Sequence, residues 1–518
     1  MNTDQFDCDV AIVGYGPSGV SAANFLGSYG ISAIAFEREA DIYSRARAVT
    51  VNDWTLRCYQ SVGLADDLLA VMDPIDAIRW ITYAKKEVMR VKLDPSQIGQ
   101  PISSMIYQPA MEKVLRAGVE RYAGCVDVRF GKDVINLTQD EAGVSVTARD
   151  LTSGQDETVR ARYLLACDGG SSRIRSELGI TMRGSTIDTR WVVIDTRVKR
   201  WWPERHLLTF WTDAQRPVVD IPLALGNHRW EFPLAPHESE SDFETPEQLW
   251  KLLRSLGVTP DNVEIHQHAF YKHHSRYAER WRSGRVFLLG DAAHLMPPWA
   301  GSGMQSGIRD ANNLCWKLRE VLKGRLPDSL LDSYQAEREP NVVMYTEISE
   351  SLGRVIKQQM TPTERVAMLA MGVLKAMHVP LPQPPLSGPP SYSQGWFNGS
   401  PSKRGAVGHM PPQPRVATAD GRRAKLDDLL GAEFVLLADG VDPQSLLSPS
   451  QRTAWTALGA RFVTLREGSQ QATSESDLFD LEGTLLSWMR KRGTRCIALR
   501  PDRFVAAAQG QSLDVPSH

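Results

Sequence analysis

Short apolar runs alternate with helical patterns in the first third of the chain. Residues 8–13 read as a buried strand, and a helical stretch follows as far as Gly30, which suits a helix C-cap. A second apolar run at 31–36 ends in Glu37, which completes one βαβ unit. The same patterns predict further elements: a helix over 109–123, strands over 126–134 and 144–148 joined by a turn near 141–143, and a buried strand over 163–167.

The pattern changes between residues 181 and 280, where strand-like runs such as 191–198 and 228–234 are rich in Trp, Phe and Arg. This region predicts a mostly antiparallel sheet inserted into an α/β core. The buried-strand pattern returns at 285–291, and a glycine-rich loop leads into a helix over about 307–322. Near the C-terminus, strands are predicted over 434–438, 461–465 and 495–499.

These patterns predict an α/β protein with a Rossmann-like first domain, an inserted β domain and a separate C-terminal domain. Dense Pro, Gly and Ser predict a linker before the last domain. The expected divisions are 1–180 for the first domain's first part, 181–280 for the substrate-binding β-sheet domain, 281–378 for the first domain's second part with a helical segment, 379–402 for the Pro-rich linker, and 403–518 for the C-terminal domain.

Composition is ordinary for a globular protein of several domains: 518 residues, 42% hydrophobic, 23% charged, and a formal net charge of -2. Nothing in it indicates binding to nucleic acid or a membrane. The acidic N-terminus lacks the features of a secretion signal, so a cytoplasmic location is predicted. The six cysteines are single and form no Cys-x-x-Cys pair, and His294 has no ligand companions at metal spacing, so no metal site is predicted.

The turn after the first predicted strand carries Gly14-x-Gly16-x-x-Gly19. Gly14 permits a tight turn, Gly16 lets the backbone approach a pyrophosphate, and Gly19 lets helix and strand pack closely. The N-terminus of the next helix offers unpaired N–H groups to phosphates. Glu37, 18 residues after Gly19, can accept hydrogen bonds from ribose hydroxyls. Between two buried strands, this motif predicts a dinucleotide site rather than a turn without a ligand.

Two later segments indicate which dinucleotide binds. Residues 168–175 fit Asp-Gly-x-x-Ser-x-x-Arg, and Gly290-Asp291 follows a predicted buried strand. Both are similar to characteristic segments of the class A flavoprotein aromatic hydroxylases, the p-hydroxybenzoate hydroxylase family. The resemblance implies that FAD is the cofactor and that Asp291 holds its ribityl chain. It also implies that Asp168 lies near the pyrophosphate and takes part in binding the pyridine nucleotide.

The resemblance extends over roughly residues 8–355. Residues 294–314 look like the family's flavin loop and following helix, although Ser302 and Gln305 stand where many relatives carry Gln and Asn. Residues 107–112 and 229–232 are similar to the branch that contains 3-(3-hydroxyphenyl)propionate hydroxylase. An Arg that contacts FAD in the family matches Arg47 better than Arg45. The cofactor-binding residues that motif and resemblance imply are Gly14, Gly16, Gly19, Glu37, Arg38, Arg47, Gln108, Asp168, Asp291, Pro298, Gly301, Gly303, Met304 and Gln305.

The C-terminal segment 403–518 is similar to the thioredoxin-like domain of the same branch. It carries no Cys-x-x-Cys pair, so we expect a structural or assembly role. A homodimer is compatible with the resemblance.

The resemblance also implies the reaction. NAD(P)H reduces FAD, and the reduced flavin and O₂ give a C4a-hydroperoxide that hydroxylates a small phenolic substrate. The sequence assigns no catalytic base and decides neither the phenol nor the choice between NADH and NADPH. A non-catalytic FAD-binding protein that sequesters an aromatic intermediate would have a nearly identical sequence. A flavin disulfide reductase lacks support because no cysteine pair is present.

Overall fold

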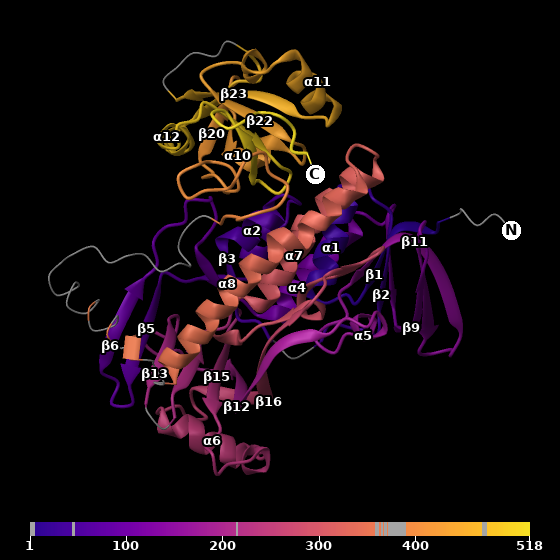
Figure 1. Cartoon of the computed structure of the whole chain (residues 1–518). Helices are drawn as coiled ribbons and strands as arrows, with labels where there is room; N and C mark the ends of the chain where they lie inside the picture. Colours follow the sequence, from indigo (N-terminus) through magenta and orange to yellow (C-terminus); the bar gives the residue numbers. More distant parts are fainter. Residues whose placement is uncertain are drawn as a thin grey trace.

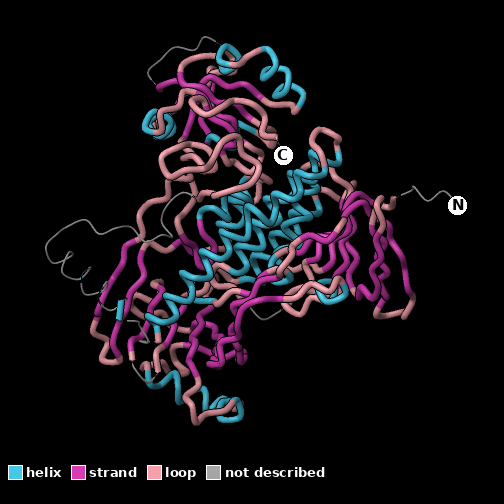
Figure 2. Tube along the Cα trace, in the orientation of Figure 1, coloured by secondary structure: helices cyan, strands magenta, loops and turns pink. Residues whose placement is uncertain are grey.

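The computed structural model describes residues 6–43, 47–213, 216–357, 362–363, 366, 370, 390–468 and 474–517. Two large sheets lie on either side of a group of helices, and the C-terminal domain packs above these helices (Figures 1 and 2). The α/β class with a mostly antiparallel second sheet, expected from the sequence, is confirmed, and β5 (Ala77–Thr82) and β13 (Leu208–Thr212) are a parallel pair within that sheet. No helix in this described part of the chain is long and apolar enough to cross a membrane.

The first sheet has a parallel centre in the order β18-β11-β1-β2-β8. Helix α1 (Pro17–Ser28) packs against β1 and β2, and β9 packs against β2. This burial explains why β1 and β2 are almost continuously apolar. Its strands are β1 (Cys8–Val13), β2 (Ala33–Glu37), β8 (Val126–Phe130), β9 (Lys132–Gln139), β10 (Val144–Asp150), β11 (Asp156–Ala166), β17 (Arg282–Ser283) and β18 (Val286–Leu288).

The single strand expected over 126–134 is wrong. Gly131, with φ of 66°, separates β8 from β9. A positive φ redirects the chain, so β8 joins the parallel centre beside β2 while β9 pairs with β10. Periodicity alone could not show this change of direction.

The second sheet has the order β19-β16-β12-β15-β14-β13-β5-β6. Its strands are β5 (Ala77–Thr82), β6 (Glu87–Lys92), β12 (Met182–Val198), β13 (Leu208–Thr212), β14 (Val218–Ile221), β15 (Asn227–Pro233), β16 (Val263–Ala278) and β19 (His294–Leu295). Val192 and Ile194 of β12 pack with α6 (Pro246–Ser255) on one face. Trp191 lies on the opposite face and packs with Trp299 of the first domain. Residues 77–92 therefore belong to a sheet that was expected only within 181–280.

A small sheet has the order β3-β7-β4. Its strands are β3 (Thr50–Asn52), β4 (Asp73–Pro74) and β7 (Ser103–Met105). Besides α6, the helices before the C-terminal domain include α1 (Pro17–Ser28), α2 (Asp53–Gln60), α3 (Ala65–Leu69), α4 (Gln108–Glu120), α5 (Arg173–Glu177), α7 (Gly303–Leu322) and α8 (Ser333–Ile356), and the 3-10 turns there include η1 (Glu240–Phe243), η2 (Gly290–Ala292), η3 (Pro298–Ala300) and η4 (Asp328–Asp332).

The C-terminal domain has its own seven-stranded sheet in the order β21-β20-β24-β23-β22-β25-β26. Its strands are β20 (Arg415–Thr418), β21 (Arg423–Lys425), β22 (Val435–Asp439), β23 (Arg461–Glu467), β24 (Leu478–Asp480), β25 (Cys496–Leu499) and β26 (Val505–Ala508). The helices are α10 (Leu426–Leu430), α11 (Pro449–Ala457) and α12 (Thr484–Lys491), with the turn η5 (Pro443–Leu446).

The expected linker over 379–402 lies outside the described residues as far as 389. Most of its remainder is exposed, but Tyr392 and Trp396 are buried, and Trp396 packs against Trp316 of α7 and Phe434 of the C-terminal domain. An ion pair also joins the domains, because Arg57 of α2 donates two hydrogen bonds, of 2.6 and 3.0 Å, to Asp427 of α10. The two parts of the chain therefore share a buried interface.

Candidate active site

The glycines in the turn between β1 and α1 have two different environments. A Cβ on Gly14 would lie 2.3 Å from the carbonyl oxygen of Cys167, and one on Gly19 would lie 2.0 Å from that of Gly14. These two glycines therefore allow close packing inside the protein. A Cβ on Gly16 would meet no protein atom within 4 Å. Open space at Gly16, beside a helix N-terminus without a side-chain cap, fits the close approach of a phosphate group.

Glu37 ends β2 with its carboxylate directed at this turn. The carboxylate accepts hydrogen bonds from the N–H of Tyr15, at 2.6 Å, and of Glu39, at 2.8 Å. A carboxylate held in this way can also accept hydroxyl groups of a ligand beside the turn. The neighbouring Arg38 is 65% exposed and pairs with Glu39, so its assignment to the cofactor stays a prediction.

Asp168 caps its own turn at the end of β11. Its carboxylate accepts hydrogen bonds from the Ser172 hydroxyl, at 2.6 Å, and from the N–H of Ile174, at 3.1 Å. Arg175 donates to the carbonyl oxygens of Gly170 and Ala292, at 2.9 Å each, and so ties this turn to the segment that contains Asp291. The structure thus shows a structural use of Asp168, and its cofactor role stays a prediction.

Asp291 lies in η2, directly after β18. Burial raises the pKa of its carboxyl group, while His294 and Arg47 act in the opposite direction. Among the described residues this carboxylate has no hydrogen-bond partner. Asp291 is half-buried, so its carboxylate is accessible to a ligand and fits one that brings hydroxyl groups.

A buried ion network fixes the backbone around Asp291. Asp310 of α7 accepts hydrogen bonds from the N–H of Gly290 (3.1 Å), from Nε2 of His294 (2.7 Å) and from Nε of Arg338 (2.8 Å). Burial alone would raise the pKa of Asp310, but His294 and Arg338 outweigh it and hold the pKa below its ordinary value. His294 therefore makes a buried structural hydrogen bond with Asp310. Within the described part of the chain, no three His, Cys, Asp or Glu side chains are grouped as metal ligands.

The glycine-rich loop before α7 is held against the small sheet. Gly301 adopts φ of 59°, and a Cβ there would lie 2.3 Å from the methyl group of Thr50. The Gln305 side chain donates to the carbonyl oxygen of Gly301, at 2.8 Å, and accepts from the N–H of Asn52, at 2.9 Å. Because the Gln305 amide is used to hold the loop, a ligand would meet the backbone N–H groups at the start of α7, where Gly303 and Met304 lie.

Gln108 positions the segment that faces this loop. Its side-chain oxygen accepts hydrogen bonds from the N–H groups of Arg47 and Ala48, at 2.8 Å each. The exposed Arg47 side chain lies over the Tyr43 ring, and Arg45 lies outside the described residues. The structure thus shows that Gln108 holds the backbone at Arg47, and its contact with a cofactor stays a prediction.

The face of the second sheet that meets the flavin loop is apolar and aromatic. Trp299 of η3 contacts the rings of Trp191 and His273, with centroid distances of 6.4 and 5.1 Å. Burial, together with Lys357 and His274, lowers the pKa of His273 to about 4, so its ring is neutral near pH 7. Phe210 and Ile221 belong to the same cluster. This apolar region can surround an aromatic ring and exclude water.

A buried ion pair borders that aromatic region. Arg229 donates two hydrogen bonds to Asp195, at 2.7 and 3.0 Å, and another to the carbonyl oxygen of Arg47, at 3.3 Å. The second sheet is thereby joined to the segment beside the loop. Sequence reasoning missed Asp195, Trp299 and His273 as parts of the site, although strand alternation over 191–197 places Trp191 and Asp195 on one face.

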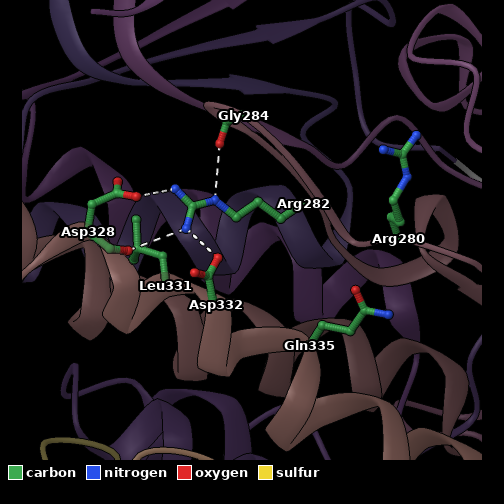
Figure 3. A pocket seen from close by; sticks show the side chains of 7 residues that line it. All are labelled: Arg280, Arg282, Gly284, Asp328, Leu331, Asp332 and Gln335. Atoms are coloured by element: carbon green, nitrogen blue, oxygen red, sulfur yellow. Dashed lines mark hydrogen bonds and ion pairs between the residues drawn. The ribbon is translucent and has the colours of Figure 1, made fainter. Parts of the chain in front are cut away.

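A different cavity, shown in Figure 3, lies at the edge strand β17. Arg282 closes much of it by pairing with Asp328 and Asp332. None of the predicted cofactor residues lines this cavity, so it is not part of the candidate site.

Comparisons with known proteins agree with this geometry. Residues 7–348 match a family described as FAD binding domain, and residues 408–516 match the HcaD C-terminal domain. The chain is 36% identical to 3-(3-hydroxy-phenyl)propionate/3-hydroxycinnamic acid hydroxylase 2 of Burkholderia vietnamiensis (strain G4 / LMG 22486), over 96% of this chain and 93% of that protein. It is also 35% identical to the hydroxylase of the same description from Mycobacterium sp. (strain JLS), with 98% of this chain and 90% of that protein covered.

Among solved structures, the fold is similar to that of the flavin-dependent monooxygenase PieE in complex with FAD and substrate. The TM-score is 0.81 at 24% identity, and the match covers 98% of this chain and 97% of that one.

Proposed function

The chain belongs to the class A flavoprotein aromatic hydroxylases, and from this membership we propose that it is an FAD- and NAD(P)H-dependent monooxygenase of a phenolic substrate. The reaction consumes one phenol, one NAD(P)H, one proton and one O₂. It yields the ring-hydroxylated product, NAD(P)⁺ and water. Bound FAD supplies the redox chemistry, since it takes electrons from NAD(P)H and activates O₂.

One observation carries the proposal. The turn at Gly16, the unpartnered carboxylate of Asp291 and the N-terminus of α7 are places where FAD can bind, and the last of them opens beside the aromatic cluster around Trp299. The residues present therefore fit the cofactor. Hydroxylation needs this combination of a flavin and a ring-binding region that excludes water.

We assign three roles in this reaction to residues of the chain. Gln305 holds the loop before α7 and Gln108 holds the backbone at Arg47, two segments that would contribute to the binding of FAD. The aromatic cluster around Trp191 and Trp299 excludes water from the reacting ring. Arg229 connects the sheet that holds the substrate to the segment beside the flavin.

The substrate class follows from the relatives. Proteins about 36% identical over nearly the whole chain are described as hydroxylases of 3-(3-hydroxyphenyl)propionate and 3-hydroxycinnamic acid. We propose a phenol with a short acidic side chain as the substrate. The experiment is a screen of phenols for faster oxidation of NADH or NADPH by the FAD-loaded protein. A hydroxylase will respond to at least one such phenol, whereas a protein that only sequesters FAD and an aromatic compound will respond to none.

FAD is expected to be bound without a covalent link. The thiol nearest to the glycine turn is Cys167, and burial raises its pKa well above the ordinary value, so it is a poor nucleophile. His294 Nε2 is occupied by Asp310. Acid precipitation should release about one FAD per chain into the supernatant. Flavin that stays in the protein pellet would contradict this expectation.

Asp291→Ala is expected to weaken FAD binding roughly tenfold or more. The variant removes a charged acceptor of hydroxyl hydrogen bonds, and each such bond contributes about 1.5–3 kcal/mol. The dissociation constant can be measured from quenching of flavin fluorescence. Asp332→Ala is the matched control because that carboxylate is 69% exposed and remote from the site. Equal dissociation constants for Asp291→Ala and the wild type would rule out the assigned role.

A further inference from the structure

A cavity of about 650 Å³ lies at one end of the second sheet. The end of β12, the turn between β14 and β15, the segment before β13 and the small sheet all contribute to it. Basic side chains dominate its charge: Lys199, Arg205 and His206 line it, whereas Asp73 is the one acidic side chain among the described lining residues. The cavity therefore favours an anion.

Arg205 is the buried cation of this cavity. It is only 4% exposed, yet its Nε has no hydrogen-bond partner among the described residues. One terminal nitrogen donates to the backbone carbonyl oxygens of Leu223 and Asn227. No carboxylate of the described chain forms an ion pair with this guanidinium. A buried guanidinium that lacks a carboxylate is costly, and an anionic ligand would satisfy it.

Apolar groups surround the charge. The ring of Trp201 lies 4.8 Å from the Arg205 guanidinium carbon, and this ring is 61% exposed. Met105 and Leu225 provide apolar surface nearby. A ligand that fits must combine a carboxylate-like anion with a hydrophobic body.

Met105 connects the cavity to the proposed active site. It lines the cavity and also belongs to the apolar cluster that contains Trp191 and Trp299. In the small sheet, Met105 pairs with Asp73 on one side and with Thr50, whose methyl group touches Gly301, on the other. Adjacent strands are about 4.8 Å apart, so the cavity begins roughly 10 Å from the flavin loop. The buried Met105 side chain lies between the cavity and the apolar cluster.

We propose that this cavity binds the carboxylate end of the aromatic substrate and that Arg205 is the residue that recognises it. The inference rests on the proposed function, because it places the substrate's ring beside Trp299 and its acidic chain beside Arg205. The enzyme thereby selects phenols with a short acidic side chain over neutral phenols of the same size.

Calorimetry on the FAD-loaded protein tests this without requiring turnover. The two probes are 3-(3-hydroxyphenyl)propionate and its neutral amide. The wild type should bind the acid at least tenfold more tightly than the amide, and Arg205→Gln should remove that difference while binding of the amide stays within twofold. Arg197→Gln is the control, since this exposed arginine donates to the carbonyl oxygen of Leu225, a residue that lines the cavity, but does not line the cavity itself.

Several outcomes would overturn the inference. They are equal wild-type affinities for acid and amide, no binding of either compound, and an acid preference that survives in Arg205→Gln. If Arg205→Gln does not fold, Arg205→Lys keeps the charge but loses the planar fork, and the acid preference should then fall at least threefold. Failure of the hydroxylase assignment is visible separately, as NAD(P)H oxidation that no phenol stimulates.

Discussion

Glu337→Ala is expected to lower the free energy of unfolding by about 3–5 kcal/mol, because it leaves buried cations without their partner. Glu337 lies in α8 and is fully buried. Its carboxylate accepts two hydrogen bonds of 2.8 Å from Arg500 of the C-terminal domain, and Lys317 of α7 lies 3.0 Å away. Glu337 therefore joins the C-terminal domain to the helices that carry the active-site loop.

The loss of stability caused by Glu337→Ala should depend on pH. Burial alone would raise the pKa of Glu337, but Arg500 and Lys317 outweigh it and lower the pKa from 4.5 to about 2. A lowered folded-state pKa gives stability that is present above pH 4.5 and is lost as the pH falls toward 2. The difference between the wild type and Glu337→Ala, measured by urea unfolding, should narrow over that range.

Glu339→Ala is the matched control for this variant. It lies two residues further along α8 and pairs with Arg183, whose side chain is 58% exposed. Exposed pairs contribute about 1 kcal/mol or less. Equal losses for the two variants would show that the buried network has no special role in domain docking.

Gly16→Val is expected to weaken FAD binding about a hundredfold or more without unfolding the protein. A Cβ at this position meets no protein atom within 4 Å, so the side chain would fill space left for the pyrophosphate. The loss of two charged hydrogen bonds, at about 1.5–3 kcal/mol each, corresponds to a rise of about a hundredfold or more in the dissociation constant of FAD. Gly124→Val is the control. A Cβ at Gly124 also meets no protein atom within 4 Å, and Gly124 lies outside the glycine turn between β1 and α1. FAD binding at wild-type strength in Gly16→Val would contradict the placement of the cofactor.

The sequence predicted the parts of the structure that depend on local patterns. The βαβ unit around Gly14–Gly19 and the strand before Asp291 follow from apolar runs and glycine spacing, and the α/β class is confirmed. Strands β5 and β6 were not placed in the second sheet, because β5 pairs with β13, about 130 residues later, and no local pattern encodes that partner.

Polar contacts between residues far apart in the chain also could not be predicted from the sequence. The contacts of Gln108 and Gln305 with backbone groups of distant segments were not predicted, and their contact with the cofactor stays a prediction. Glu337 and Arg500 are 163 residues apart, and only the folded chain shows them as one buried pair. Such contacts depend on tertiary packing, whereas glycine and helix-terminus sites depend on a few consecutive residues. The domain boundaries, a cytoplasmic location and a homodimer stay predictions.

The most direct test of the central claim is the origin of the new oxygen atom. The FAD-loaded protein is mixed with NADH or NADPH and 3-(3-hydroxyphenyl)propionate under ¹⁸O₂, and the product is analysed by mass spectrometry. A monooxygenase will give a ring-hydroxylated product that contains one ¹⁸O atom. NAD(P)H oxidation that forms only hydrogen peroxide, with the phenol recovered unchanged across the phenols that bind, would contradict the account.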